Sequence, residues 1–283
     1  MFALVLAILG TFSISMLVKA AQVSGDDTRQ VITSNYITAA LIGWGLVIWQ
    51  GWPGLSPVTF WLGVGGGILW PGTLYILIWG IERYGVSLAG SASRLSLTVP
   101  VLFALIFLGE QLTLLVTLGL LLAFVALFLL MPLRGDALAS IDKQALWYFP
   151  FEIIAFGFVA LWSNLFNIYG REPEEFLFVT LVFSFSLLFS LIALAFLKVE
   201  FSAKAWRRGL IIGAPNVVHI FFLVQALQTE TFASRSAVAY TIYSALGVIL
   251  VFGAGVLWWK EPVQRSSVAG IFVAIIAIIL LNL

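Results

Sequence analysis

Ten apolar runs, each about long enough for one membrane crossing, constrain this chain more than any other feature. Crossing the hydrocarbon core of a bilayer takes about 20 mostly apolar residues in a helix. The runs lie at 2–20, 33–50, 59–82, 87–109, 112–132, 146–169, 175–197, 209–227, 233–259 and 267–282. The connections between them are short, so no separate soluble domain is expected. We predict an all-α polytopic membrane protein with ten transmembrane helices.

The composition excludes other classes of protein. Of the 283 residues, 62% are apolar and only 10% are charged, whereas soluble domains are about 25% charged. A transmembrane β-barrel would show alternating segments of about 10 residues, but the runs here are continuous. With 14 Lys and Arg against 13 acidic residues, the chain has no basic surface for nucleic acid. The absence of cysteine excludes disulfides and thiolate metal sites.

The two halves of the sequence resemble each other. Matching positions are Glu110 and Glu261 at an offset of 151 residues, Ser15 and Ser163 at 148, and Pro71 and Pro215 at 144. Five spans followed by five matching spans place the halves in opposite orientations, because five is odd. We therefore predict two inverted five-helix repeats, 1–132 and 146–283, joined by a loop at 133–145. Inverted repeats with a site between them are typical of secondary transporters.

Three motifs carry a resemblance to a known family. They are Gly109-Glu110 after the fourth span, Lys260-Glu261 after the ninth, and Lys19 at the end of the first. With them the chain resembles a ten-helix, EamA-type member of the drug/metabolite transporter superfamily. The resemblance implies export or exchange of amino acids or similar amphipathic solutes by alternating access. Small multidrug members of the superfamily carry an essential carboxylate at the position of Thr11, so export of lipophilic cations by their mechanism is not expected.

Polar stripes on the fourth and ninth spans predict a substrate site. Ser91, Arg94 and Thr98 are spaced to share one helical face, and Tyr240 and Tyr243 lie on the repeat-equivalent face. An arginine inside a membrane is costly unless it faces protein or water, so we expect Arg94 to bind an anionic group of the substrate. The alternative is that the serine and threonine tighten helix packing while Arg94 pairs with a backbone carbonyl.

Other polar residues in the spans extend this prediction. We expect Ser15 and Ser163 to line the cavity, and neutral His219 to hydrogen bond to substrate together with its repeat mate Tyr75; the alternative for His219 is a packing role. Glu152 is a candidate for ion or proton coupling, or else it stabilises a helix N-terminus near the membrane surface. Pro71 and Pro215 are candidate hinges, although prolines are frequent in membrane helices.

The sequence leaves other functions open. A lipid-linked flippase or an accessory membrane subunit is the alternative to a metabolite transporter. An intramembrane enzyme is less favoured, because no Gly-x-Ser-x-Gly motif is present. No phosphate-binding loop and only one histidine occur, so we expect neither ATP hydrolysis nor a metal or other cofactor. The expected partners are a small-molecule substrate and the lipid bilayer, with the chain a monomer or homodimer in the plasma membrane (the inner membrane of a bacterium or archaeon).

The two indicators of orientation disagree. Loops after odd-numbered spans carry eleven of the 14 Lys and Arg, loops after even-numbered spans carry two, and Arg94 lies within a span. Cytoplasmic loops are enriched in these residues, so the charges favour both termini outside the cytoplasm. The family resemblance implies both termini inside.

Overall fold

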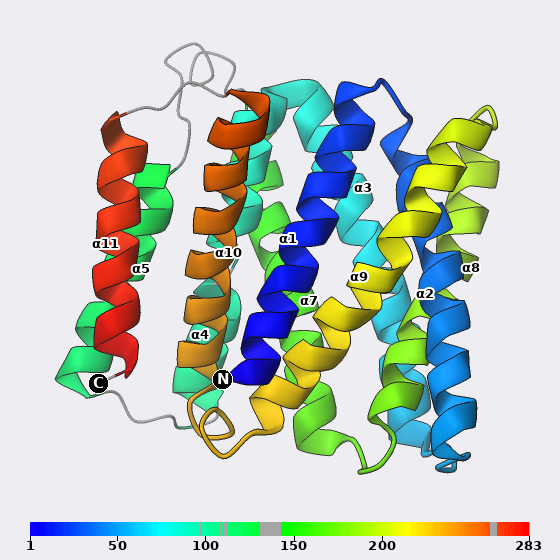
Figure 1. The fold of residues 1–283 in the computed structure, drawn as a ribbon, viewed down its shortest axis with the longest axis horizontal. Helices are drawn as coiled ribbons and strands as arrows, with labels where there is room; N and C mark the ends of the chain where they lie inside the picture. Colours follow the sequence, from blue (N-terminus) through cyan, green and yellow to red (C-terminus); the bar gives the residue numbers. More distant parts are fainter. Residues whose placement is uncertain (97, 108, 110–112, 131–142, 261–264, 283) are drawn as a thin grey trace. The chain divides into compact units, whose positions relative to one another are not determined.

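The computed structural model describes residues 1–96, 98–107, 109, 113–130, 143–260 and 265–282, and this part of the chain forms helices joined by turns (Figure 1). The helices are α1 (Phe2–Val23), α2 (Thr28–Gln50), α3 (Pro57–Leu95), α4 (Thr98–Phe107), α5 (Leu114–Leu130), α7 (Ala145–Tyr169), α8 (Glu175–Phe196), α9 (Ala203–Gln228), α10 (Ser236–Trp259) and α11 (Arg265–Asn282). Most of the expected connecting loop 133–145 lies outside the described residues, as do Glu110 and Glu261.

Within the described residues, seven helices are long and apolar enough to cross a membrane. They cover Phe2–Val23, Thr28–Gln50, Pro57–Ile81, Ala145–Tyr169, Glu175–Phe196, Ala203–Gln228 and Ser236–Trp258. Backbone groups in lipid must be satisfied within the protein, and a helix does this by itself. The prediction of an all-α, multi-pass membrane protein is therefore confirmed. Shorter apolar stretches occur at Leu114–Ala126 in α5 and Val268–Leu280 in α11.

The third and fourth expected spans differ from the prediction. Instead of a connection at 83–86, helix α3 continues without a break to Leu95, and the short helix α4 begins at Thr98. Glu82, Arg83 and Tyr84 are polar or amphipathic but continue a helix readily, so a drop in hydropathy did not mark a helix end. Thr98 is the first residue of α4, whereas Ser91 and Arg94 belong to α3; that the three side chains share one substrate-facing side stays a prediction.

Helices α2 and α9 begin before their apolar runs, where polar residues cap them. The carboxylate of Asp27 accepts a hydrogen bond from the backbone N–H of Arg29 at 2.9 Å, so α2 begins at Thr28 instead of 33. Ser202 Oγ accepts from the N–H of Ala205 at 3.4 Å, and α9 begins at Ala203 instead of 209. Such caps satisfy backbone donors that have no partner within the helix.

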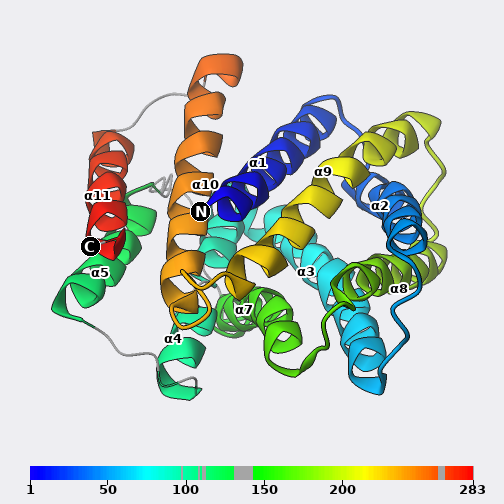
Figure 2. The same cartoon turned by 60° about the horizontal axis from the view of Figure 1, so that its bottom comes forward.

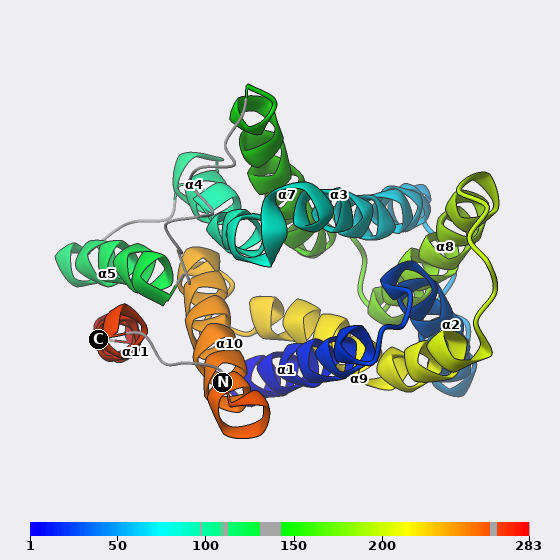
Figure 3. The ribbon, with the colours of Figure 1, turned by 90° about the horizontal axis from the view of Figure 1, so that it is seen from above.

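The helices form two compact units that are interleaved along the sequence. Unit 1 comprises Met1–Gly72 and Trp162–Gln228, and unit 2 comprises Thr73–Leu161 and Thr229–Leu283. In unit 1, α9 packs beside α1 and α2, and α2 also packs beside α8 (Figure 2). In unit 2, α5 and α11 lie side by side, and α10 packs against α4 (Figure 3). The unit border inside α3 falls directly after Pro71 and Gly72.

Glycines allow the closest helix contacts in unit 1. A Cβ atom at Gly209 of α9 would lie 1.9 Å from Ser34 Oγ and 2.1 Å from the carbonyl oxygen of Val31, both on α2. One turn later, a Cβ at Gly213 would lie 2.5 Å from Thr38 Cβ. Small residues let membrane helices approach closely enough for dispersion forces to hold them. The α2–α9 contact therefore requires glycine at both positions.

Polar side chains tie the helix ends of unit 1 together. Gln30 of α2 is buried and donates to the carbonyl of Glu200 at 2.8 Å, while its side-chain oxygen accepts from Ser202 N at 2.7 Å and Trp206 Nε1 at 3.0 Å. Asp26 forms ion pairs with Lys204 and Arg208. These contacts join the α1–α2 turn to the start of α9. Both the oxygen and the nitrogen of the Gln30 side-chain amide are hydrogen bonded.

A second polar contact joins the start of α3 to the start of α8. Glu174 is buried and accepts a hydrogen bond from Ser56 Oγ at 2.7 Å. Burial raises the pKa of the Glu174 carboxyl, but hydrogen bonds from Thr59 and Ser56 and the charge of Arg171 outweigh burial, and the net pKa lies below the ordinary value of 4.5. The ionised carboxylate is therefore the form that the folded protein favours.

This contact predicts a pH-dependent stability. Since the folded pKa of Glu174 is depressed, its contribution is complete above the unfolded pKa near 4.5 and is lost as the pH falls through the folded value. Glu174→Gln should cost about 2 kcal/mol at pH 7. Thermal melting in detergent at pH 7 and below pH 4.5 measures this: the difference between wild type and variant should shrink at the lower pH. A difference that is the same at both pH values would contradict the assignment.

Candidate functional site

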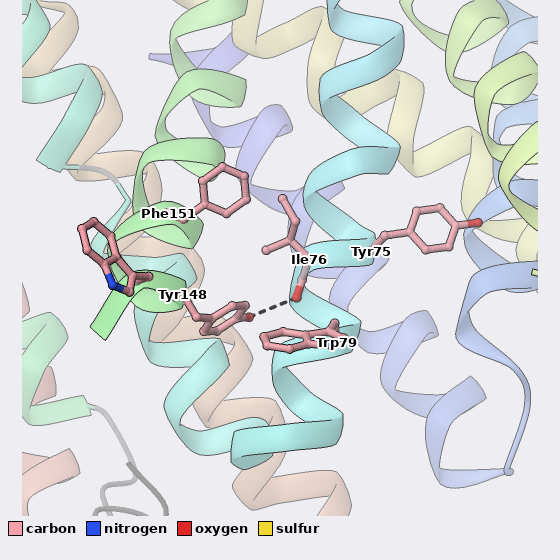
Figure 4. A pocket seen from close by; sticks show the side chains of 6 residues that line it. Tyr75, Ile76, Trp79, Tyr148 and Phe151 are labelled. Atoms are coloured by element: carbon pink, nitrogen blue, oxygen red, sulfur yellow. Dashed lines mark hydrogen bonds between the residues drawn. The ribbon is translucent and has the colours of Figure 1, made fainter. Parts of the chain in front are cut away.

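Unit 2 contains an aromatic pocket between α3 and α7 with a volume of about 630 Å³ (Figure 4). Its lining residues are Tyr75, Ile76 and Trp79 of α3 and Trp147, Tyr148 and Phe151 of α7. On each helix the three residues follow the spacing that places side chains on one side of a helix. The volume lies in the range of sites for small organic molecules.

A close contact between the two helices fixes the inner wall of the aromatic pocket. The Tyr148 hydroxyl donates to the carbonyl of Ile76 at 3.0 Å, and a Cβ atom on Gly80 would lie only 1.7 Å from that hydroxyl oxygen. The rings of Trp79 and Tyr148 pack with their centroids 5.0 Å apart. Figure 4 shows these two rings together, whereas the ring of Tyr75 extends away from Tyr148 and Phe151. The wall is thus preformed, and Tyr75 is peripheral to it.

The pocket opens on the surface of unit 2. Trp147 is 82% exposed, Phe151 is 57% exposed and Trp79 is 44% exposed. On membrane-spanning helices, exposed aromatic rings face lipid or the membrane interface. A ligand can therefore reach the outer rings without any change in the inner wall.

Glu152 lies on α7 one turn after Tyr148 and beside Phe151. Its side chain is completely buried, with a relative exposure of 0%. The Tyr148 hydroxyl, which donates to the Ile76 carbonyl, also lies near enough to the Glu152 carboxyl to interact with it. Neither carboxyl oxygen has a donor in hydrogen-bond geometry among the described residues. A buried carboxyl without donors is unfavourable unless it holds a proton or faces a cation.

Aromatic rings in and beside the pocket already hold a cation, the guanidinium group of Arg83. The guanidinium carbon of Arg83 lies 5.9 Å from the centre of the Trp79 ring and 5.8 Å from that of Tyr84. Tyr84 in turn packs on Tyr148, with ring centroids 5.3 Å apart. These distances are those of cation–π interactions.

Unit 1 contains the predicted residues Ser15, Ser163 and His219. Ser163 of α7 is buried, and Ser15 donates to the carbonyl of Thr11 on its own helix at 2.9 Å. The backbone and Cβ of His219 pack on Gly10 of α1, where a Cβ atom would lie 2.8 Å from His219 N. His219 and Tyr75 belong to different units, and their pairing remains a prediction.

Sequence analysis did not single out three buried asparagines of unit 1: Asn35, Asn164 and Asn216. Asn216 of α9 donates to Asn35 Oδ1 of α2 at 2.7 Å. Asn167 of α7 donates to the carbonyl of Val224 at 3.4 Å, and the neighbouring Asn164 Nδ2 is buried without an acceptor among the described residues. Asparagine in a span was the available signal, because polar groups at this depth usually join helices or line a cavity.

The other predicted residues lie in helices α3, α4, α9 and α10. Tyr240 of α10 is buried and donates to the carbonyl of Ala160 on α7 at 2.8 Å, so its hydroxyl joins these helices. Tyr243 is half-buried on the same helix. Pro71 and Pro215 lie inside α3 and α9. The side chains of Ser91, Arg94 and Thr98 lie outside the described residues. In the described part of the chain, no three His, Asp or Glu side chains gather in a metal-binding group.

Comparisons with known proteins identify a relative in sequence and a solved structure with the same fold. No family model matches the chain. The chain is 27% identical over 292 residues to an uncharacterized protein of Haemophilus influenzae, and the match covers 97% of this chain and 95% of that protein. The chain also matches a protein of known crystal structure, with a TM-score of 0.78 and 14% sequence identity. The match covers 99% of this chain and 98% of the chain in that crystal structure. At this identity the likeness shows that the two chains share a fold.

Proposed function

We propose that the chain is a secondary transporter of small organic metabolites with ten crossings in two inverted five-helix repeats. It moves amino acids or similar amphipathic solutes by alternating access, as an exporter or exchanger, in the plasma membrane of a bacterium or archaeon. It acts as a monomer or homodimer and catalyses no chemical reaction. Inverted repeats are the architecture on which many secondary transporters are built.

The observation that carries this proposal is a pair of equivalent helix contacts in unit 1. A Cβ at Gly63 of α3 would lie 2.5 Å from Leu181 Cβ of α8, and one at Gly67 would lie 2.2 Å from Phe185 Cβ. Adding 146 residues to the glycines gives Gly209 and Gly213, and subtracting 147 from their partners gives Ser34 and Thr38. These are the residues of the α2–α9 contact. The α3–α8 contact is thus repeated by α9 and α2.

The directions of the helices support an inversion. In both contacts the residue numbers increase together, so α3 runs parallel to α8, and α9 runs parallel to α2. If α2 and α3 are successive crossings, they run in opposite directions, and each helix is then antiparallel to its equivalent in the other repeat. The helix starts agree: Ser56 Oγ accepts from Thr59 N at 3.2 Å, as Ser202 Oγ does from Ala205 N, again 146 residues later.

Binding of soluble metabolites tests this proposal. A ligand that binds the folded state raises the melting temperature according to its concentration and affinity. We expect at least one amphipathic metabolite in a panel of amino acids, amines and organic acids to stabilise the purified protein. Stabilisation by lipids alone would contradict the proposal.

A lipid-linked flippase is the second candidate, because the aromatic pocket opens through exposed Trp147 and Phe151. A flippase must admit part of a lipid from the side, and an opening toward lipid would serve that purpose. The same melting panel separates the two candidates, since a flippase responds to lipids and a metabolite transporter to soluble solutes.

A further inference from the structure

We propose that the basic end of unit 1 binds anionic phospholipids, with Lys198 and Arg207 contacting the phosphate of the headgroup. The basic end is where α1 and α8 end and α2 and α9 begin, at the top of Figure 1, and it comprises residues 19–29 and 198–208. Its ligand belongs to the surrounding membrane, so this surface goes beyond the proposed transport function and does not depend on it.

The charged side chains of unit 1 are distributed unequally between its two ends. The basic end has an excess of cations, with Lys19, Arg29, Lys198, Lys204, Arg207 and Arg208 against Asp26, Asp27 and Glu200. The opposite end, where Glu174 meets Ser56, has an excess of carboxylates, with Glu172, Glu174 and Glu175 against Arg171. Lysine and arginine near a membrane surface are attracted to anionic lipids. The basic end therefore complements such a surface, and the opposite end does not.

Two cations of the basic end are not used by its internal ion pairs. These pairs join Asp26 to Lys204, Asp26 to Arg208, and Asp27 to Arg29. Lys198 and Arg207 are exposed, and neither forms an ion pair with another described residue. Their charges are therefore available to an anion from outside the chain.

Exposed apolar side chains lie on the helices next to both cations. Ile192 and Phe196 are exposed in the last turns of α8, and Lys198 lies two residues beyond its end. On α9, Ile211 is 61% exposed and follows Arg207 by one helical turn. Long basic side chains near the ends of membrane helices extend to the headgroup level. A phospholipid can thus place its chains on these apolar side chains and its phosphate at either cation.

Aromatic residues hold the α8–α9 turn in place between the two cations. Phe201 is 73% exposed, and its ring packs on that of Trp206 with the centroids 5.7 Å apart. Trp206 Nε1 in turn donates to the buried Gln30 side chain at 3.0 Å. Exposed aromatic rings at helix ends are typical of the membrane interface. The turn therefore presents Lys198 and Arg207 from a fixed backbone at the level where headgroups lie.

This surface also favours one of the two orientations. Anionic lipids give the cytoplasmic leaflet its negative surface potential, so we expect the basic end at the cytoplasmic face. Helix α1 begins at Phe2 and reaches the basic end only at its last turn. Met1 would then lie outside the cytoplasm, as the loop charges favour and the family resemblance does not.

Equilibrium binding of fluorescent lipids to the purified full chain in detergent micelles tests the inference. The probes are phosphatidylglycerol, which is anionic, and phosphatidylcholine with the same acyl chains, which is zwitterionic. We expect phosphatidylglycerol to bind more tightly than phosphatidylcholine, and to bind about fivefold more weakly after Lys198→Gln and after Arg207→Gln. Binding of phosphatidylcholine should be unchanged. Because both side chains are exposed, their replacement should not disturb folding.

Arg171→Gln is the matched control, because it removes an exposed cation from the opposite end of unit 1 and should leave lipid binding unchanged. Inorganic phosphate, compared with chloride at equal ionic strength, should not displace the lipid, since it has no chains to contact Phe196 or Ile211. The inference is overturned if the two lipids bind equally well, if both variants bind phosphatidylglycerol like wild type, or if inorganic phosphate displaces it. A metabolite found in the melting panel would still support transport, so the two proposals fail separately.

Cysteine labelling tests the orientation, because the chain has no cysteine of its own. Ser24→Cys places a thiol at the basic end, and Leu55→Cys places one at the opposite end, both at exposed positions. On intact bacterial cells, a membrane-impermeant maleimide should label Leu55→Cys and leave Ser24→Cys unlabelled. Labelling of Ser24→Cys alone would show that the basic end does not face the cytoplasmic leaflet.

Discussion

Replacement of Gly209 by leucine should prevent unit 1 from forming. A Cβ at this position would lie 2.1 Å from the carbonyl oxygen of Val31, which belongs to the backbone of α2 and cannot move aside as a side chain could. Overpacking of a core typically costs about 1–3 kcal/mol, and leucine adds three further carbon atoms to the clash. We expect little folded protein, seen as aggregation in size-exclusion chromatography and a missing thermal transition.

The equivalent substitution Gly63→Leu, on α3, should have the same effect, because its Cβ would lie 2.5 Å from Leu181 Cβ. Gly45→Leu in α2 is the matched control, since a Cβ there meets nothing within 4 Å. A Gly209→Leu protein that melts at the temperature of the Gly45→Leu protein would show that the α2–α9 contact is not as close as described.

Removal of the Arg94 side chain should abolish transport of carboxylated solutes. Breaking a buried ion pair costs at least about 3 kcal/mol, which corresponds to about 100-fold in affinity. Arg94→Lys should restore part of the activity, because lysine keeps the charge but lacks the bidentate geometry of the guanidinium. Uptake into proteoliposomes measures both variants, with exposed Arg171→Ala as the control. Unchanged uptake in Arg94→Ala would assign Arg94 a structural role instead.

The class of the fold could be predicted from the sequence, because a helix that crosses a bilayer needs about 20 mostly apolar residues. Continuous apolar runs such as 2–20 and 175–197 correspond closely to Phe2–Val23 and Glu175–Phe196. Helix ends were predicted less well, since hydropathy measures burial in lipid and not the limits of a helix. Asp27 and Ser202 extend α2 and α9 beyond the apolar runs, and the polar residues near Arg83 continue α3.

The site was predicted only in part. The sequence singled out Tyr75, which lines the aromatic pocket, and Glu152, one residue after Phe151, because a carboxyl within a span and a tyrosine at the repeat position of a histidine are unusual; their roles in binding and coupling stay predictions. The pocket itself was not, since 15% of the chain is aromatic and nothing local distinguishes Trp79 or Trp147 from rings that face lipid. Their meeting depends on Gly80, which lets Tyr148 approach α3, and such a contact between distant segments has no signal in a single sequence.

Solute counterflow in proteoliposomes tests the central proposal most directly. Vesicles containing the purified protein are loaded with a metabolite that stabilises it, and entry of the same labelled solute is followed from outside. A secondary transporter with alternating access should exchange the solute without ATP, and entry should stop when the internal solute is omitted and no ion gradient is applied. If labelled solute enters no faster than into protein-free vesicles, while labelled lipid crosses the bilayer only when the protein is present, the chain is not a metabolite transporter.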